Sequence, residues 1–216
     1  MTFEEDHPSF DAYQSLGQNL GAADAANRWL LSRPRRKVVQ LLKGQTVLDV
    51  GCGTGNLAAM LVAAGCRVVG VDSSATMLSH TRRKQIAAEF RHLDAAHMPF
   101  NREFEAAVIS IALHEMSPQA REEVWESMVR AVRPGGRLVA LDFTVPRRYT
   151  LPARIAVALV EQDERSMLSV HPEHYANYTE FMRGGGLHAW MQKRARAPEA
   201  EYLYWGGIVA LIVTSR

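Results

Sequence analysis

The chain has 216 residues, of which 22% are charged and 47% are hydrophobic, so it is long enough to bury the core of one globular domain. A net charge of +2 is too small to indicate a nucleic acid or an anionic membrane as a partner. The two cysteines, Cys52 and Cys66, do not form a disulfide framework, and no apolar run approaches the length of a membrane span. Because no signal peptide is evident at the N-terminus, we expect a cytoplasmic protein.

The N-terminal region has a helical pattern over residues 12–42, which Gly17, Gly21 and Pro34 interrupt. We therefore expect two or three short helices there, because glycine and proline break a helical pattern. The basic cluster at residues 33–37 is interpreted as a solvated helix start.

Residues 46–57 read TVLDVGCGTGNL, in which an apolar strand pattern ends in three glycines and a helical stretch follows. Glycine lets bare backbone approach a ligand, and the start of the following helix offers unpaired N–H groups. The spacing G-x-G-x-G differs from the G-x-G-x-x-G of dinucleotide-binding turns. Asp49, two residues before the first glycine, would repel a pyrophosphate and would suit a ligand that carries an ammonium group.

The segment Asp49-Val50-Gly51-Cys52-Gly53-Thr54-Gly55 resembles the first motif of class I S-adenosylmethionine (SAM) methyltransferases, (D/E)-x-G-x-G-x-G, and matches it at every fixed position. The resemblance implies that SAM is the cofactor, with S-adenosylhomocysteine as product. It also implies that Asp49, Gly51, Cys52 and Gly53 hold the methionine part of SAM. The fold implied is α/β, Rossmann-like and doubly wound, with a mostly parallel seven-stranded sheet, a C-terminal antiparallel strand and an N-terminal helical cap.

The next expected strand, residues 67–71, ends at Asp72, about where an acidic residue after a second parallel strand holds a ribose. A carboxylate accepts hydrogen bonds from both vicinal ribose hydroxyls, in NAD and SAM alike; the alternative is a helix-capping aspartate. Ser73 or Ser74 begins the following helix. We expect Ser73 and Met77 among the cofactor contacts.

A short third strand, residues 90–93, is followed by the sequence DAAHMPF at residues 94–100. This sequence is similar to the D-A-x-x-x-P-F pattern of SAM methyltransferases. The resemblance implies that the carboxylate of Asp94 and the backbone N–H of Ala95 hydrogen-bond the adenine.

The fourth strand, residues 104–110, is apolar enough to be buried on both faces. Ligands of parallel α/β sheets bind at the carboxyl ends of the strands, which makes Ser110 and Ile111 candidate cofactor contacts. His114 is the best-placed candidate base, since an unperturbed imidazole titrates near neutral pH, and Glu115 is a candidate to replace or orient it. The alternative is that His114 packs beside the cofactor and orders the loop.

The rest of the chain predicts a helix from Ser117-Pro118, a turn at residues 133–136, a strand at 137–143, a helix at 151–168, a helix from His171-Pro172 to the glycines at 184–186, and strands at about 188–194 and 207–214. His171 and His174 are interpreted as structural. The eight histidines and two cysteines show no ligand spacing, so no metal site is predicted.

Three C-terminal segments carry a closer resemblance. Residues 136–143 (GRLVALDF), the helix from His171-Pro172 and residues 206–211 (GGIVAL) are similar to the ubiquinone/menaquinone biosynthesis C-methyltransferases. The chain departs from that family in the sequence LHEM at 113–116 and in a shorter segment at 145–170. The resemblance implies methyl transfer to a small hydrophobic or aromatic acceptor. Its candidate pocket residues in the N-terminal region are Phe10, Tyr13 and Trp29.

We expect one domain, with a helical cap at residues 1–43, a cofactor-binding core at 44–143, and substrate-side helices and the last strands at 144–216. A small-molecule acceptor is the partner that the sequence indicates. Two other classes of protein stay open. A SAM-binding regulator that transfers no methyl group would carry the same motifs, and an NAD-linked oxidoreductase is disfavoured by the glycine spacing and Asp49.

Overall fold

The structure, a computed structural model, describes residues 20–166, 168, 171–194 and 198–216. Its strands are β1 (Thr46–Val50), β2 (Arg67–Asp72), β3 (Glu89–His92), β4 (Phe104–Ser110), β5 (Val132–Phe143), β6 (Ala200–Tyr204) and β7 (Val209–Ser215). Its α-helices are α1 (Leu20–Leu42), α2 (Asn56–Ala63), α3 (Ala75–Arg83), α4 (Pro118–Ala131), α5 (Leu151–Ser166), α6 (Pro172–Arg183) and α7 (Gly186–Gln192). Its short 3-10 helices include η2 (Ala95–His97), η3 (Leu113–Glu115) and η5 (Trp205–Gly207).

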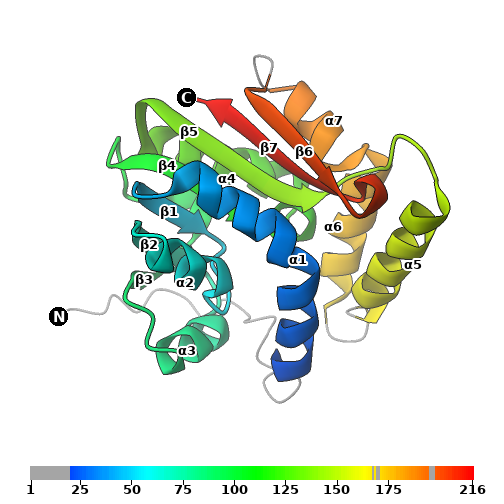
Figure 1. The fold of residues 1–216 in the computed structure, drawn as a ribbon, viewed down its shortest axis with the longest axis horizontal. Helices are drawn as coiled ribbons and strands as arrows, with labels where there is room; N and C mark the ends of the chain where they lie inside the picture. Colours follow the sequence, from blue (N-terminus) through cyan, green and yellow to red (C-terminus); the bar gives the residue numbers. More distant parts are fainter. Residues whose placement is uncertain (1–19, 167, 169–170, 195–197) are drawn as a thin grey trace.

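The strands form a single seven-stranded sheet in the order β3-β2-β1-β4-β5-β7-β6 (Figure 1). Strands β1 to β5 pair in parallel, whereas β7 is antiparallel to both β5 and β6. This confirms the predicted α/β fold with a mostly parallel sheet and an antiparallel C-terminal strand. The strand order reverses between β1 and β4, and the carboxyl ends of strands at such a switch point are where α/β sheets bind ligands.

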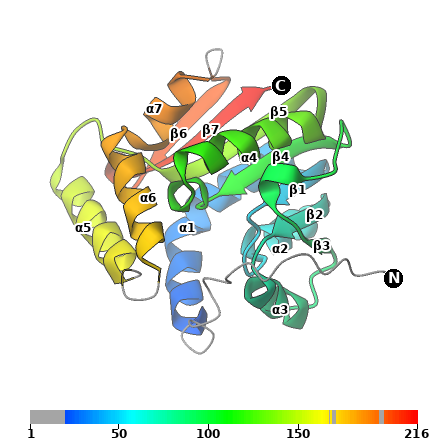
Figure 2. The ribbon, with the colours of Figure 1, turned by 180° about the vertical axis from the view of Figure 1, so that it is seen from behind.

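Both faces of the sheet are buried, and neighbouring residues of a strand face opposite layers. On β4, Ala107 and Ile109 belong to the core that α4 and α7 cover, whereas Ala106 and Val108 belong to the core that α1 and α2 cover. Figure 1 shows α1 and α2 across one face, and Figure 2 shows α4 across the other. No helix within the described ranges is long and apolar enough to cross a membrane.

Helix α1 is continuous from Leu20 to Leu42 and contains Pro34. The prediction of several short helices is therefore wrong for the described part, while residues 1–19, with Phe10 and Tyr13, lie outside it. Proline costs roughly 3 kcal/mol inside a helix, but the buried side chains of Val38 and Leu42 pack this helix against the sheet. Figure 1 shows the helix changing direction part-way along, as expected at a proline.

The strand predicted at residues 188–194 is also wrong, because this segment lies mostly in α7. Leu187, Trp190 and Met191 are all buried, and their i, i+3, i+4 spacing is that of a helix face. The Trp190 ring packs edge-on against Trp125 of α4 at a centroid distance of 5.5 Å. The sixth strand instead lies further along the chain, and β5 extends back through the predicted turn to Val132, which pairs with Phe104.

A close backbone contact fixes where α7 begins. Gly186 forms an antiparallel bridge with Thr144, and a Cβ at Gly186 would lie 2.5 Å from the Thr144 Cα. Gly186 has a φ of 64°. Gly65 also has a positive φ, 85°, but a Cβ added there would have no atom of the described residues within 4 Å, so Gly65 can serve as a comparison.

We expect Gly186→Ala to lower the free energy of unfolding by about 1–3 kcal/mol more than Gly65→Ala, because alanine would overpack only the first site. The left-handed backbone costs alanine roughly 1–2 kcal/mol at both positions, so the difference isolates the close contact. Urea unfolding of both variants measures it, and equal losses would contradict this account of α7.

Candidate active site

The glycine turn after β1 is packed on one side and open on the other. Gly51, Gly53 and Gly55 have φ values of 64°, 53° and 76°, the left-handed region that favours glycine. A Cβ at Gly51 would lie 3.1 Å from the Ala112 Cβ, whereas no atom of the described residues lies within 4 Å of one at Gly53. The turn therefore contacts the loop after β4 and leaves room for a ligand over Gly53.

Asp72 connects this turn to the next two strands. Its Oδ2 accepts from the Gly53 N–H at 2.7 Å and its Oδ1 from the Ser74 N–H at 2.9 Å. Its backbone oxygen accepts from the Leu93 N–H at 3.1 Å. Backbone donors therefore orient the Asp72 carboxylate at the carboxyl end of β2.

The other predicted contacts follow the ends of β2 and β3. Ser74, rather than Ser73, caps α3, with its Oγ accepting from the Met77 N–H at 3.0 Å. Asp94 caps η2, with Oδ1 accepting from the Ala96 N–H at 2.9 Å. Its Oδ2 lies 2.8 Å from His97 Nδ1, and its side chain is 65% exposed. Ala95, with its N–H at the start of η2, stands beside it.

Asp49 is the buried charge of the site. It is 1% exposed, and its Oδ2 has no hydrogen-bond partner among the residues that the structure describes. Burial raises the pKa of the carboxyl to about 7, with Asp72 adding to the rise and Arg35 opposing it. Arg35 itself is only 9% exposed. The expectation that the whole basic cluster of α1 is solvated is therefore wrong for this residue. A carboxylate oxygen without a donor is costly to bury, so it suits a cationic hydrogen-bond donor.

The carboxyl end of β4 borders the same space. The Ser110 hydroxyl is buried and, within the described part of the chain, has no hydrogen-bond partner. Ile111 has a φ of 56°, and its N–H donates to the Leu141 oxygen at 2.7 Å. A positive φ is strained for a β-branched residue, and such strain concentrates at functional sites.

Asp142 of β5 organises the loop that follows. Its Oδ2 accepts from the backbone N–H groups of Ala112, Leu113 and His114 at 3.2, 2.8 and 3.3 Å. Its Oδ1 lies 2.6 Å from His114 Nδ1 and accepts from the Phe143 N–H at 2.7 Å. These contacts fix both the backbone of η3 and the orientation of the His114 ring.

Two further side chains, from α5 and α6, lie beside His114. Glu164 of α5 approaches His114 Nε2 with its Oε1 at 3.5 Å, and its Oε2 lies 2.7 Å from His174 Nε2 on α6. Burial would lower the pKa of His114, but Asp142 and Glu164 raise it well above the ordinary value. Burial would raise the pKa of Glu164, but the two histidines lower it to about 2. Because these contacts favour protonated His114, they support the interpretation that His114 orders the loop. They disfavour the interpretation that it acts as a free base.

Comparison with known proteins places this site in a family. A methyltransferase-domain family model matches residues 47–136. The demethylmenaquinone methyltransferase of Clavibacter sepedonicus is 35% identical over 114 residues, 51% of this chain and 46% of that protein. The demethylmenaquinone methyltransferase of Paenarthrobacter aurescens is 30% identical over 197 residues, 84% of this chain and 70% of that protein. This chain belongs to the class I SAM-dependent methyltransferases.

A solved structure shares the fold of this chain. The PH0226 protein of Pyrococcus horikoshii OT3 superposes with a TM-score of 0.60 at 19% identity, covering 88% of this chain and 90% of that one. SAM is the cofactor of the family, and the residues present fit it: the unpartnered Asp49 oxygen suits an ammonium, and the open turn suits a ligand over bare backbone. The chain spans less than half of the length of the Clavibacter relative.

Sequence reasoning missed three residues that shape this methyltransferase site. Arg121 is 2% exposed, and it donates to the Leu113 oxygen at 2.9 Å and to the Asn177 oxygen at 3.1 Å. Glu164 comes from a helix far along the chain, and no local signal marks it. Asp142 had a signal, because an acid within an otherwise apolar strand repeats the pattern that drew attention to Asp49.

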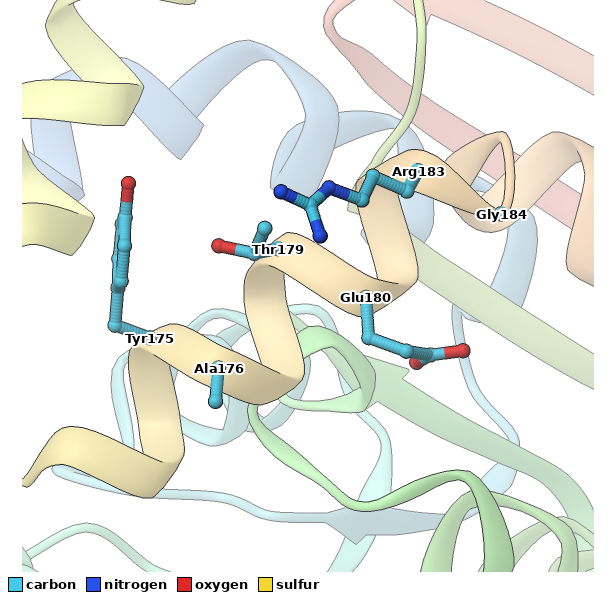
Figure 3. A pocket seen from close by; sticks show the side chains of 6 residues that line it. All are labelled: Tyr175, Ala176, Thr179, Glu180, Arg183 and Gly184. Carbon is cyan, nitrogen blue, oxygen red and sulfur yellow. The ribbon is translucent and has the colours of Figure 1, made fainter.

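A hollow of about 610 Å³ lies along α6, lined by Tyr175, Ala176, Thr179, Glu180, Arg183 and Gly184. Figure 3 shows Tyr175, Thr179 and Arg183 pointing to the same side of the helix. None of the predicted cofactor residues is among those that line it. The buried residues of α6 are His174, Tyr178 and Phe181, so the hollow lies on the other, more exposed side of this helix. Asn177 donates to the Glu115 backbone oxygen at 2.8 Å.

We expect Asp49→Asn to change how stability depends on pH. The folded-state pKa of about 7 lies above the ordinary value of 3.8. The folded protein therefore binds more protons than the unfolded chain between these values, and the free energy of unfolding falls as pH rises through that window. Relative to wild type, the variant should gain about 2–4 kcal/mol between pH 4 and 8.

Urea unfolding of ligand-free protein across this pH range measures the gain. The exposed Glu126→Gln variant serves as the control and should follow wild type. A difference between Asp49→Asn and wild type that stays constant with pH would contradict the buried-charge account.

Proposed function

We propose that this protein transfers the methyl group of SAM to a small hydrophobic or aromatic acceptor. The observation that carries the proposal is the buried Asp49 oxygen without a hydrogen-bond donor beside an open glycine turn. The ammonium group of SAM supplies both the charge and the N–H donors that this oxygen requires. A pyrophosphate would instead bring negative charge against a buried carboxylate, which disfavours NAD.

The remaining residues divide the cofactor among them in this proposal. Asp72 accepts from the ribose hydroxyls, and Ser73 and Met77 lie at the edge of the ribose site. Asp94 and the Ala95 N–H bind the adenine. The backbone at Gly51, Cys52 and Gly53 lies along the methionine part, and Ser110 and Ile111 close the site from β4.

Bound SAM supplies an electrophilic methyl group, and the reaction is an in-line displacement. The protein's contribution is alignment, which accounts for roughly 7–11 kcal/mol of barrier reduction in well-oriented reactions. The strand ends supply that alignment, because hydrogen bonds hold the glycine turn to Asp72 and hold the loop after β4 to Leu141 and Asp142 of β5.

The acceptor side is built from η3 and the helices that cover it. Glu115 is 28% exposed at its side chain, and Asn177 of α6 donates to the Glu115 backbone oxygen. We place the acceptor here, with Glu115 touching it and His114 as a positioning residue. The names of the relatives make a reduced naphthoquinone ring the first acceptor class to test.

The test supplies SAM with reduced 1,4-naphthoquinones, with or without a short isoprenyl chain, beside catechol and indole as other aromatic acceptors. We expect S-adenosylhomocysteine to form in proportion to a product heavier by one methyl group. Tight SAM binding without product from any acceptor would favour the SAM-binding regulator instead.

For the cofactor, we expect Asp72→Asn to weaken SAM binding by about 1.5–3 kcal/mol, the value of a hydrogen bond to a charged group. Isothermal titration with SAM and S-adenosylhomocysteine measures this, with NADH as the ligand control and Glu126→Gln as the protein control. An unchanged dissociation constant would show that the ribose binds elsewhere.

For the acceptor side, we expect Glu115→Gln to lower kcat by about 10²-fold or more, the size of a lost proton-transfer group, with SAM affinity unchanged. Steady-state kinetics and SAM titration of the same preparation separate the two effects. Wild-type kcat in this variant would remove Glu115 from the reaction, and a parallel loss of SAM binding would assign it to loop structure.

A further inference from the structure

Three buried potential metal ligands from three separate elements converge beside the proposed acceptor site. They are His114 on η3, Glu164 on α5 and His174 on α6, with exposures of 1%, 6% and 7%. One donor atom from each lies within 4.8 Å of the other two. We propose that His114, Glu164 and His174 bind a divalent transition-metal ion of the Zn²⁺ class.

The ligand chemistry suits such an ion. Two imidazoles and one carboxylate leave a fourth coordination position, the arrangement of open zinc sites. Zn–N and Zn–O bonds of about 2.0–2.2 Å place tetrahedral donor atoms roughly 3.4 Å apart. The distance from His114 Nε2 to Glu164 Oε1 is 3.5 Å. His174 Nε2 lies 2.7 Å from the other Glu164 oxygen, so only a small rearrangement would bring all three donors onto one ion.

The outer contacts of His114 are those expected of a metal ligand. Histidines that bind metals commonly donate their other ring N–H to a carboxylate, which fixes the ring and its tautomer. His114 Nδ1 lies 2.6 Å from Asp142 Oδ1, and Asp142 is itself held by four backbone N–H groups. Nε2 is thereby left facing Glu164. Local ligand spacing could not predict this arrangement, because its parts are spread over sixty residues. The proposal therefore differs from our expectation that the chain has no metal site.

The charge of the cluster also fits a divalent ion. Three carboxylates, Asp142, Glu164 and Glu115, lie within 4 Å of the two histidines. Two added positive charges offset part of this negative charge, and either two protons or one divalent ion would provide them. A divalent ion held by the two histidines and Glu164 would therefore be attracted by the carboxylates around it.

The experiment uses untagged, full-length protein and Co²⁺ as a spectroscopic substitute for Zn²⁺. The matched control is His188→Gln, because His188 makes a similar 2.7 Å contact with a carboxylate, that of Glu201, but no second histidine completes the set there among the described residues. The test variants are His174→Gln and Glu164→Gln, with circular dichroism as the check that each variant folds.

We expect wild type and His188→Gln to bind one equivalent of Co²⁺ with visible d–d absorption, and Zn²⁺ to displace it. His174→Gln and Glu164→Gln should bind at least about 10-fold more weakly. If a variant fails to fold, thermal unfolding of wild type with and without Zn²⁺ decides the question, since a ligand of the folded state raises the melting temperature.

Two results would overturn the proposal: folded wild type that takes up no Co²⁺ and is not stabilised by Zn²⁺, or folded cluster variants that bind as tightly as wild type. The first would make the cluster a proton-bridged ion-pair network, and the second would place the metal elsewhere. Neither result depends on methyl transfer, so the metal site and the proposed function fail separately.

Discussion

The geometry of the acceptor side depends on the burial of one carboxylate, Asp142. A charge with no exposure to water needs donors inside the protein, and Asp142 receives them from three consecutive N–H groups of the loop after β4, from the Phe143 N–H and from the His114 ring. The loop therefore has one arrangement compatible with the buried charge. Through Arg121 and Asn177, that arrangement also fixes where α6 lies.

Asp49 and Asp142 are both acids within apolar strands, yet their surroundings differ in a way that separates a ligand site from a structural one. Asp142 is fully supplied with donors by the chain itself. Asp49 has one buried oxygen without a donor, and burial raises its pKa to about 7. A group whose desolvation is not compensated in the protein alone is compensated when a ligand binds. In the proposed function, the burial of Asp49 lowers the stability of the ligand-free protein at the place where it binds SAM.

The sequence predicted best the elements whose cause is local. The fourth strand has the bounds predicted for it, and Ser117 caps α4 as its Ser-Pro start indicated. Tertiary packing overrode local signals elsewhere: buried contacts keep α1 helical through Pro34, and the face of Leu187, Trp190 and Met191 makes α7 a helix. The glycine turn and Asp72 were predictable because their chemistry is set within short segments. The contact of Glu164 with His114 joins residues fifty positions apart, so only the fold could reveal it.

The position of α5 is decided by polar contacts more than by apolar burial. Leu151, Ile155 and Leu159, at four-residue spacing, are exposed, whereas Ala153, Val160 and Glu164 are the buried residues of this helix. So small an apolar face holds a helix weakly, and the contacts of Glu164 with the two histidines and of Glu161 with Tyr175 add to it. A change in what occupies the histidine cluster, protons or a metal ion, would therefore be transmitted to α5. Because Glu164 of α5 also contacts His174 of α6, such a change would reach both helices.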